Sequence, residues 1–375
     1  MKTEKKVNYI ICGLFCGFLA LFLLMYLFWP KTDFSEKEKR YLQEMPRLNW
    51  DSVVSGEFGT KAEKAAADHM PWRDFFLQLN AKFDRALNLQ STKEIYVGVD
   101  GRLFERPYRN DPAAIVRNMK AINDFAQGLG QEVNLMLVPS SGYLLAEEIA
   151  GLADPYIDDQ LIDEAYALAG EYTKPVQLLE HFQTQPDPAA LYYRGDHHWT
   201  SLGAYTACDY FFSSKGRALP GTEEYTIQKV DGFYGSTYSR ACLWDTAPES
   251  LELWDSGSQY TVSFSDKEGE FNSVFFPERL EEMDKYPVWL DGNHPLVVIN
   301  NESEAAEGAL LIVRDSFGSC FAPFAAEEYE TVVLVDLRYY KLPVSQLFSQ
   351  WDFEDILIMY YVGNFMSDTN LVWLS

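Results

Sequence analysis

Residues 309–317 read ALLIVRDSF, and this stretch decides which fold class the sequence predicts. An unbroken apolar run is typical of a strand that is buried on both faces of a parallel sheet. The polar pair Asp315-Ser316 follows the run, and a helical segment is expected at 319–328. The sequence therefore predicts an α/β fold in which Ser316 lies where a strand gives way to a helix.

Further strand and helix patterns alternate on both sides of this unit. Strands alternating with helices of about ten residues indicate a parallel sheet with helices on both faces. Between 219 and 290 the apolar runs are shorter and alternate with polar residues, which predicts a β-rich insertion. The expected strands are 133–139, 296–300, 331–337 and 355–362, the expected helices are 112–129, 158–172 and 343–351, and a hairpin is expected at 94–105.

The N-terminus carries a different signal, because Val7 to Trp29 contains no charged residue. Such a stretch is long enough to cross a hydrocarbon core of about 30 Å. Three lysines precede it, so the positive-inside rule places the N-terminus in the cytoplasm and the rest of the chain outside. The bulky residues 26–29 do not suit signal-peptide cleavage, which favours a retained single-pass anchor in a bacterial cytoplasmic membrane.

The sequence thus divides into a tail and transmembrane anchor (1–30), a juxtamembrane helical segment (31–90) and an α/β domain (91–375). In the middle segment, Phe75, Leu79 and Phe83 have helical spacing, which predicts a stalk that packs on the α/β domain. Pro71 is expected to break this helical segment.

The net charge and the cysteine content limit which partners and which disulfides the protein can have. The net charge is −25, and because the first six residues carry +2, the rest of the chain carries −27. Such an acidic surface repels nucleic acid, so no nucleic-acid partner is expected. Outside the membrane span the sequence has three cysteines, Cys208, Cys242 and Cys320, so at most one disulfide is possible there and whether any forms stays open.

A second polar cluster, residues 194–200, reads RGDHHWT. A serine hydroxyl becomes a good nucleophile when a base takes its proton and a carboxylate orients that base. Asp196 and His198 are two residues apart, so in an extended segment their side chains point to the same side. At a strand–helix junction the hydroxyl of Ser316 would lie near helix N-terminal amides. These residues suit a Ser–His–Asp acyl-transfer site.

Other interpretations of the same residues stay open. A serine at a strand–helix junction is commonly a helix N-cap, and a histidine pair beside a tryptophan can be a packed corner. A metal site could use Asp196, His197, His198 and the distant His294, although their spacing is not of the usual zinc kinds. His69 and His181 lie in ordinary helical or loop contexts and are expected to be structural.

Beyond these residues, the segment RGDHHWTSLGAY (194–205) resembles the signature of the bacterial DHHW protein family. The resemblance covers nearly all of the chain after the anchor, with the segments in the expected order. That family is in turn similar to the SGNH-like O-acetyltransferases of alginate biosynthesis, which implies an SGNH-like sheet flanked by helices. The further matching segments are FSEKEKRYL (34–42), DHMPWRD (68–74), YVGVDGRLFE (96–105), HPLVVINN (294–301), LLIVRDSFGSCFAPF (310–324) and VDLRYY (335–340).

The resemblance also implies roles for individual residues. Asp196 and His198 match the acid–base pair and Ser316 matches the nucleophile. The backbone amide of Phe317 is a candidate oxyanion donor. Arg338 is a candidate for contact with the oxyanion or the substrate, with a structural salt bridge as the alternative, and His197 either positions substrate or packs. No cofactor and no metal are expected.

The implied function is an extracytoplasmic, serine-dependent O-acyltransferase or esterase that acts on a cell-envelope polysaccharide. A membrane-bound O-acyltransferase that passes acyl groups across the bilayer is the implied partner. A second hypothesis is a non-catalytic envelope or glycan-binding protein, in which Ser316 would lie out of reach of His198. A third is a metal-dependent hydrolase that uses the histidine pair.

Overall fold

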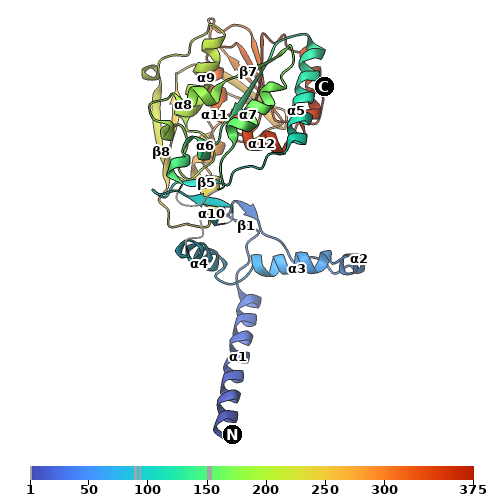
Figure 1. Cartoon of the computed structure of the whole chain (residues 1–375), viewed down its shortest axis with the longest axis vertical. Coiled ribbons are helices and arrows are strands. Elements are labelled where there is room, and N and C mark those ends of the chain that lie inside the picture. Colours follow the sequence, from blue (N-terminus) through green and yellow to red (C-terminus); the bar gives the residue numbers. More distant parts are fainter. Residues whose placement is uncertain (1, 88–90, 93, 150–153) are drawn as a thin grey trace. The chain divides into compact units, whose positions relative to one another are not determined.

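The structure is a computed structural model that describes residues 2–87, 91–92, 94–149 and 154–375. They form two compact units (Figure 1). The smaller unit comprises Met1–Leu89 and Cys242–Trp244, and the larger unit comprises Gln90–Ala241 and Asp245–Ser375. Each unit is described separately.

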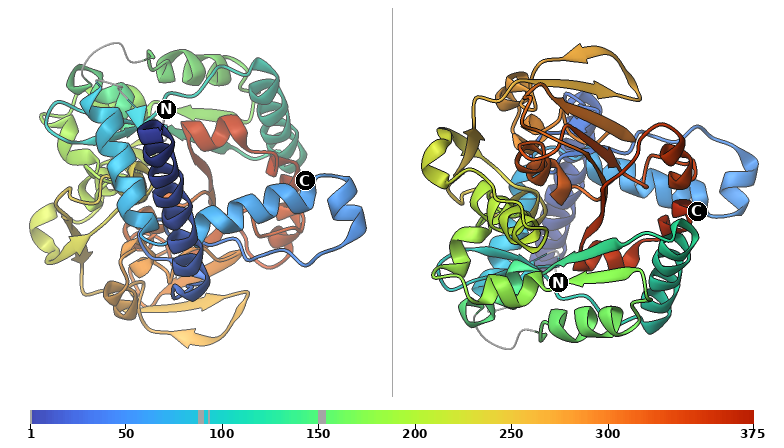
Figure 2. Two further views of the ribbon diagram at one scale, coloured as in Figure 1. Left: turned by 90° about the horizontal axis from the view of Figure 1, so that it is seen from below. Right: turned by 90° about the horizontal axis from the view of Figure 1, so that it is seen from above.

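An eight-stranded mixed sheet forms the centre of the larger unit (Figure 2). Its strand order is β11-β10-β12-β14-β13-β15-β6-β7. The strands from β14 to β7 are parallel, whereas β12, β10 and β11 join antiparallel at one edge. The predicted α/β class is confirmed. The strands are β6 (Val133–Val138), β7 (Thr173–Val176), β10 (Tyr260–Phe264), β11 (Lys267–Phe271), β12 (Leu296–Asn301), β13 (Ala309–Arg314), β14 (Thr331–Val335) and β15 (Asp355–Tyr361).

Helices surround this sheet in two packed groups, one of α5, α7 and α12 and another of α8, α9 and α11 (Figure 1). The strand β13 at the centre of the sheet is buried along its whole length, as the unbroken apolar run predicts. The helices are α5 (Pro112–Leu129), α6 (Ser141–Leu144), α7 (Asp158–Ala167), α8 (Leu178–Gln183), α9 (Ser201–Ser214), α10 (Ser236–Ala241), α11 (Phe317–Ala325) and α12 (Val362–Ser367).

Local signals explain where several of these helices begin and end. Asp111 caps α5, and Gly130 ends it in the left-handed conformation. The helix expected at 319–328 begins earlier, at Phe317, because Ser316 already has helical backbone angles. Residues expected to form a helix at 343–351 form a 3₁₀ helix instead, Val344–Ser349.

The β-rich segment predicted at 219–290 divides between two sheets. Strands β8 (Thr226–Phe233) and β9 (Glu249–Asp255) pair antiparallel in a sheet of their own. Strands β10 and β11 instead extend the central sheet through β12. This segment therefore supplies one edge of the core sheet as well as a separate two-stranded sheet. Three short strands, β3 (Ser91–Thr92), β4 (Ile95–Val97) and β5 (Leu103–Glu105), form a further small sheet.

The smaller unit begins with α1 (Lys2–Phe28), in which Lys6–Phe28 is long and apolar enough to cross a membrane. Pro71 separates α3 from α4, as predicted. Asp68, at the end of α3, is buried and accepts hydrogen bonds from the Arg40 guanidinium. This contact ties the short strand pair of β1 and β2 to α3. The elements after α1 are β1 (Phe34–Ser35), β2 (Arg40–Tyr41), α2 (Trp50–Val54), α3 (Glu57–Asp68) and α4 (Arg73–Ala86).

Candidate active site

The candidate site lies at the carboxyl end of β13, where Ser316 follows the strand and precedes α11. The neighbouring Asp315 is buried and fixes this turn. Its carboxylate accepts hydrogen bonds from the Phe317 amide (3.0 Å), the Tyr361 amide (2.9 Å) and the Asn364 side chain (2.7 Å). The turn is therefore fastened to the end of β15, the next parallel strand, and Ser316 remains partly exposed.

The histidine pair lies on a loop that is closed by an antiparallel bridge between Tyr192 and Trp199. The Trp199 side chain is fully buried and packs against Phe317, with ring centroids 5.2 Å apart. Thr200 then caps α9, because its side chain accepts a hydrogen bond from the Gly203 amide (3.2 Å). The loop is thus attached on its buried side to the helix that follows Ser316.

This attachment brings Ser316, His198 and Asp196 into one chain of hydrogen bonds. The Ser316 Oγ lies 2.8 Å from His198 Nε2, and His198 Nδ1 lies 2.6 Å from Asp196 Oδ1. A carboxylate only accepts hydrogen bonds, so Nδ1 carries the proton and Nε2 is left to accept the serine hydroxyl proton. Asp196 and His198 are 2% and 6% exposed, so water competes little for these bonds.

Backbone donors hold Asp196 in place. Its Oδ1 also accepts the His198 amide (2.8 Å), and its Oδ2 accepts the Ser236 amide (2.5 Å). Gly235 packs so closely that an added Cβ would lie 2.3 Å from the Asp196 Cβ, so only glycine fits there. Sequence analysis did not identify Gly235 or Ser236, because they lie about forty residues along the chain in a segment without a motif.

Aromatic rings enclose the imidazole of His198. The Tyr286 ring stacks on it with centroids 3.9 Å apart and planes 14° apart, and the His197 ring lies at 3.9 Å. Tyr286 also donates its hydroxyl hydrogen to the Ser316 carbonyl oxygen (3.3 Å). Burial lowers the pKa of His198, and the neighbouring His197 lowers it further, whereas Asp196 opposes the shift. The imidazole is therefore held in its neutral form, which can act as a base.

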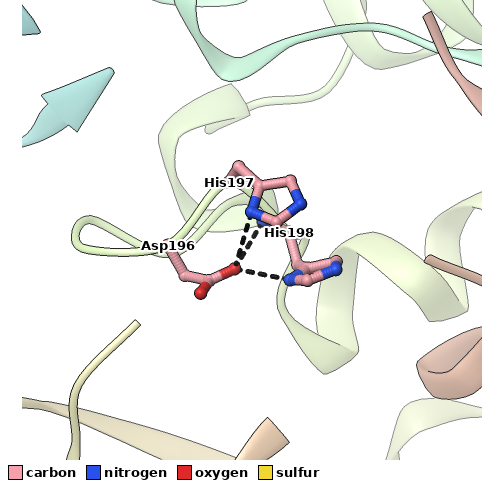
Figure 3. A group of neighbouring side chains, drawn as sticks. All are labelled: Asp196, His197 and His198. Carbon is pink, nitrogen blue, oxygen red and sulfur yellow. Dashed lines mark hydrogen bonds and ion pairs between the residues drawn. The ribbon is translucent and has the colours of Figure 1, made fainter. Parts of the chain in front are cut away.

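His197 lies outside the hydrogen-bond chain that leads to Ser316. Its Nδ1 is 2.6 Å from the Ser236 Oγ and 3.6 Å from Asp196 Oδ1, so Asp196 faces both imidazole rings (Figure 3). Its side chain is 19% exposed, which leaves part of the ring accessible from solvent.

The amide of Phe317, expected to stabilise an oxyanion, is already engaged. It donates to Asp315 Oδ1 at 3.0 Å, and a backbone amide has a single hydrogen. The residue instead contributes its ring, which packs on His198 (4.8 Å) and stacks on Tyr361 (5.0 Å). This geometry does not fit the oxyanion role expected for Phe317.

The Arg338 guanidinium lies on the buried carboxylate of Asp336. Its Nε is 2.9 Å from Asp336 Oδ1 and its Nη2 is 2.6 Å from Oδ2. Nη2 also lies 3.3 Å from the Asn293 Oδ1, which in turn accepts from Arg314. These contacts match the structural salt bridge that was the alternative for Arg338, and its side chain remains 35% exposed.

Ligand atoms of Asp196, His197 and His198 lie within 4.8 Å of one another, so a metal site needs consideration. Two ligands about 2.0–2.1 Å from one tetrahedral ion lie roughly 3.3 Å apart. The 2.6 Å between His198 Nδ1 and Asp196 Oδ1 is shorter and matches a hydrogen bond. His294, the fourth proposed ligand, is elsewhere and bonds to Asp266 (2.7 Å). The geometry therefore favours the triad interpretation over a metal site.

Comparison with known protein families agrees with the resemblance inferred from the residues. The family model described as DHHW protein matches residues 179–335, which include both polar clusters. The model described as SGNH hydrolase-like domain, acetyltransferase AlgX, matches residues 95–222. The predicted resemblance to the DHHW family and to SGNH-like acetyltransferases is confirmed. No curated protein sequence matches the chain significantly.

Solved structures share the fold. A DHHW family protein from Eubacterium siraeum has a TM-score of 0.65 and 19% identity, and the match covers 76% of this chain and 95% of that one. PatB1 from Bacillus cereus, in a structure with a sulfonyl adduct, has a TM-score of 0.62 and 20% identity, with 73% and 95% of the two chains covered. At this identity the likeness shows that the fold is shared.

Proposed function

We propose that this chain is a serine-dependent O-acyltransferase or esterase that acts on a cell-envelope polysaccharide. The observation that carries the proposal is the 2.8 Å between Ser316 Oγ and His198 Nε2, within a chain that ends on Asp196. A non-catalytic binding protein has no need of this alignment, and that second hypothesis expected Ser316 to lie out of reach of His198. The match to an acetyltransferase family model supports acetyl as the group transferred.

In the first half of the reaction, Ser316 Oγ attacks the acyl carbonyl carbon while His198 Nε2 takes the hydroxyl proton. Asp196 keeps the imidazole oriented through Nδ1 and stabilises the positive charge that forms. The donor's leaving group departs with the proton from His198, and the acyl group remains as an ester on Ser316. Atoms and charge balance without any cofactor.

In the second half, a hydroxyl group replaces the leaving group. His198 removes its proton, the oxygen attacks the acyl carbon, the bond from that carbon to Ser316 Oγ breaks, and His198 returns the proton to Ser316. A sugar hydroxyl yields an O-acylated glycan, and water yields the free acid. Part of the His197 side chain is exposed near the triad, and part of the Arg338 side chain is exposed next to β13, the strand that precedes Ser316. We therefore assign both residues as candidate substrate contacts.

We further propose that the N-terminal helix stays in the membrane and that the larger unit lies outside the cytoplasm. Lys6–Phe28 fits a single-pass anchor or a signal segment, and the lysines before it favour an internal N-terminus. An anchored chain would remain close to a membrane-bound O-acyltransferase, which could supply acyl groups from the cytoplasmic side.

The experiment that tests this function gives the purified full chain, in detergent micelles, an activated acetyl ester and soluble fragments of cell-wall glycan. Mass spectrometry then measures ester-linked acetyl on the glycan, alongside free acetate. We expect acetylated glycan with the wild-type chain and none with Ser316→Ala. Free acetate alone would assign the chain as an esterase. If neither acetylated glycan nor free acetate formed, the proposed function would be contradicted.

The pH dependence of ester cleavage follows from the environment of His198. Only the neutral imidazole can take the Ser316 proton, and burial lowers the pKa of this histidine. A lowered pKa keeps the base neutral further into the acidic range. We expect kcat/KM to stay constant as the pH falls to about 6.5, the ordinary histidine value, and to decline only below it. A decline that begins clearly above that value would contradict this assignment.

A further inference from the structure

Helix α4 in the smaller unit presents an unusual face to its surroundings. Four large apolar side chains along it, together with Trp72 directly before its first residue, are exposed and form what we call the α4 stripe. At 3.6 residues per turn the four helical members fall within an arc of about 100°. The stripe consists of Trp72 (49% exposed), Phe75 (59%), Phe76 (37%), Leu79 (51%) and Phe83 (60%).

The face of α4 opposite the stripe is partly buried. Ala81, which lies roughly half a turn away from the stripe, is 1% exposed. The Arg73 side chain, in the first turn of α4, is 12% exposed and pairs with Glu38. An amphipathic helix of a water-soluble protein normally has its apolar stripe inside and its charges outside. On α4 the apolar stripe is instead exposed, so it needs an apolar environment outside the protein.

The location of α4 in the chain points to lipid as that environment. Trp72, the first residue of the stripe, packs edge-on against Trp29, with ring centroids 5.5 Å apart. Trp29 directly follows the candidate membrane span Lys6–Phe28. Tryptophan is enriched where a membrane meets water. The stripe therefore begins beside the outer end of the span.

Charge also distinguishes this part of the chain. Residues 31–87 contain ten basic and ten acidic side chains, so they are neutral overall, although the whole chain carries −25. A neutral segment can approach anionic lipid head groups, whereas a strongly acidic one is repelled. Lys82 flanks the stripe on α4, where an ammonium group suits lipid phosphates.

We propose that α4 is an interfacial helix, whose stripe lies among the lipid head groups and upper acyl chains of the outer leaflet of the membrane that α1 crosses. Such helices bury their apolar face by about 5–10 Å. The inference rests on α1 remaining in the membrane, but not on the chemistry of Ser316. It gives the chain a second attachment to the bilayer beside the span.

The test uses the full chain in vesicles of phosphatidylethanolamine and phosphatidylglycerol, with Cys12 and Cys16 replaced by serine. A nitroxide is attached through Leu79→Cys or Phe83→Cys on the stripe. Matched controls are Asn80→Cys and Arg85→Cys, which are exposed positions of the same helix outside the stripe. Collision rates with oxygen, which enriches in lipid, and with a water-soluble nickel chelate report where each label lies.

We expect the ratio of oxygen to nickel collisions to be about fivefold or more higher at the two stripe positions than at the two controls, as for a helix half-immersed in lipid. Equal ratios at all four positions would place the stripe in water and overturn the proposal. Stripe labels shielded from both reagents would also overturn it, since protein would then cover the stripe. If dilution with unlabelled chain removed spin–spin broadening, the protein that covers the stripe would be a second copy of this chain.

A separate form that keeps only Cys16 of the two span cysteines reports on α1 itself. A lipid-exposed label at Cys16 with water-exposed stripe labels would refute the interfacial helix and leave the anchor intact. A water-exposed label at Cys16 would refute the anchor, on which the inference depends. Neither result would bear on ester cleavage by the triad.

Discussion

Ser316→Ala should reduce cleavage of an activated acetyl ester by about 10³-fold or more. The substitution removes the hydroxyl oxygen that faces His198 Nε2, while the His198–Asp196 pair stays in place. Loss of one member of a Ser–His–Asp triad typically removes nearly all the rate enhancement that the triad provides. The measurement is kcat/KM of the purified full chain, with circular dichroism to verify folding.

The matched control for this variant is Ser213→Ala, which removes a hydroxyl from an exposed position on α9. It should leave the rate unchanged. If Ser316→Ala retained more than about a tenth of the wild-type rate, another residue would be the nucleophile. The metal-dependent mechanism would then regain support, and loss of activity with a chelator would identify it.

Asp196→Asn should lower kcat/KM by about 10³–10⁴-fold while the fold is retained. The Asp196 carboxylate accepts three hydrogen bonds, from the amide and Nδ1 of His198 and from the amide of Ser236. An asparagine offers one acceptor oxygen, so its NH₂ group must face at least one of these donors. It also lacks the negative charge that stabilises the imidazolium during proton transfer.

Asp124→Asn is the control for loss of a carboxylate, because Asp124 forms an exposed ion pair with Lys120. Exposed pairs of this kind contribute about 0–1 kcal/mol to stability, so neither activity nor folding should change measurably. An Asp196→Asn variant with activity within tenfold of wild type would mean that Asp196 only shapes the loop. In that case another group would have to orient His198.

The elements that form the site were largely predictable from the sequence. The apolar run before Asp315-Ser316 predicts the buried strand, and polar residues after a strand end up at the sheet edge. The spacing of Asp196 and His198 suits a carboxylate that orients an imidazole. Trp199, which follows directly, supplies the buried contact that fastens the loop to α11.

Other parts of the site depend on contacts between distant segments, which no local pattern encodes. Tyr286 stacks on His198 from a 3₁₀ turn far along the chain, and Gly235 fits against Asp196 only because the backbones meet there. The Phe317 amide was expected to face an oxyanion. The side chain two residues before it, Asp315, captures that amide, and such local competition depends on a rotamer that the sequence does not specify.

The juxtamembrane helix α4 also shows that a local pattern predicts an element but not its contacts. The spacing of Phe75, Leu79 and Phe83 correctly predicts a helix, and Pro71 correctly predicts a break before it. Spacing indicates that the apolar residues share one face, but it does not say what covers that face. The expected packing of this face on the α/β domain stays a prediction, and all three side chains are exposed in the structure.

The central claim is that Ser316 accepts the acyl group, and the most direct measurement is mass spectrometry of the acylated chain. The full chain is mixed with an activated acetyl ester, quenched in acid within seconds and digested. We predict an acetyl ester on Ser316 itself in the wild-type chain, removable by mild base, and none on the corresponding peptide of Ser316→Ala. Ester turnover without an adduct on Ser316, or with an adduct on another residue, would contradict the account.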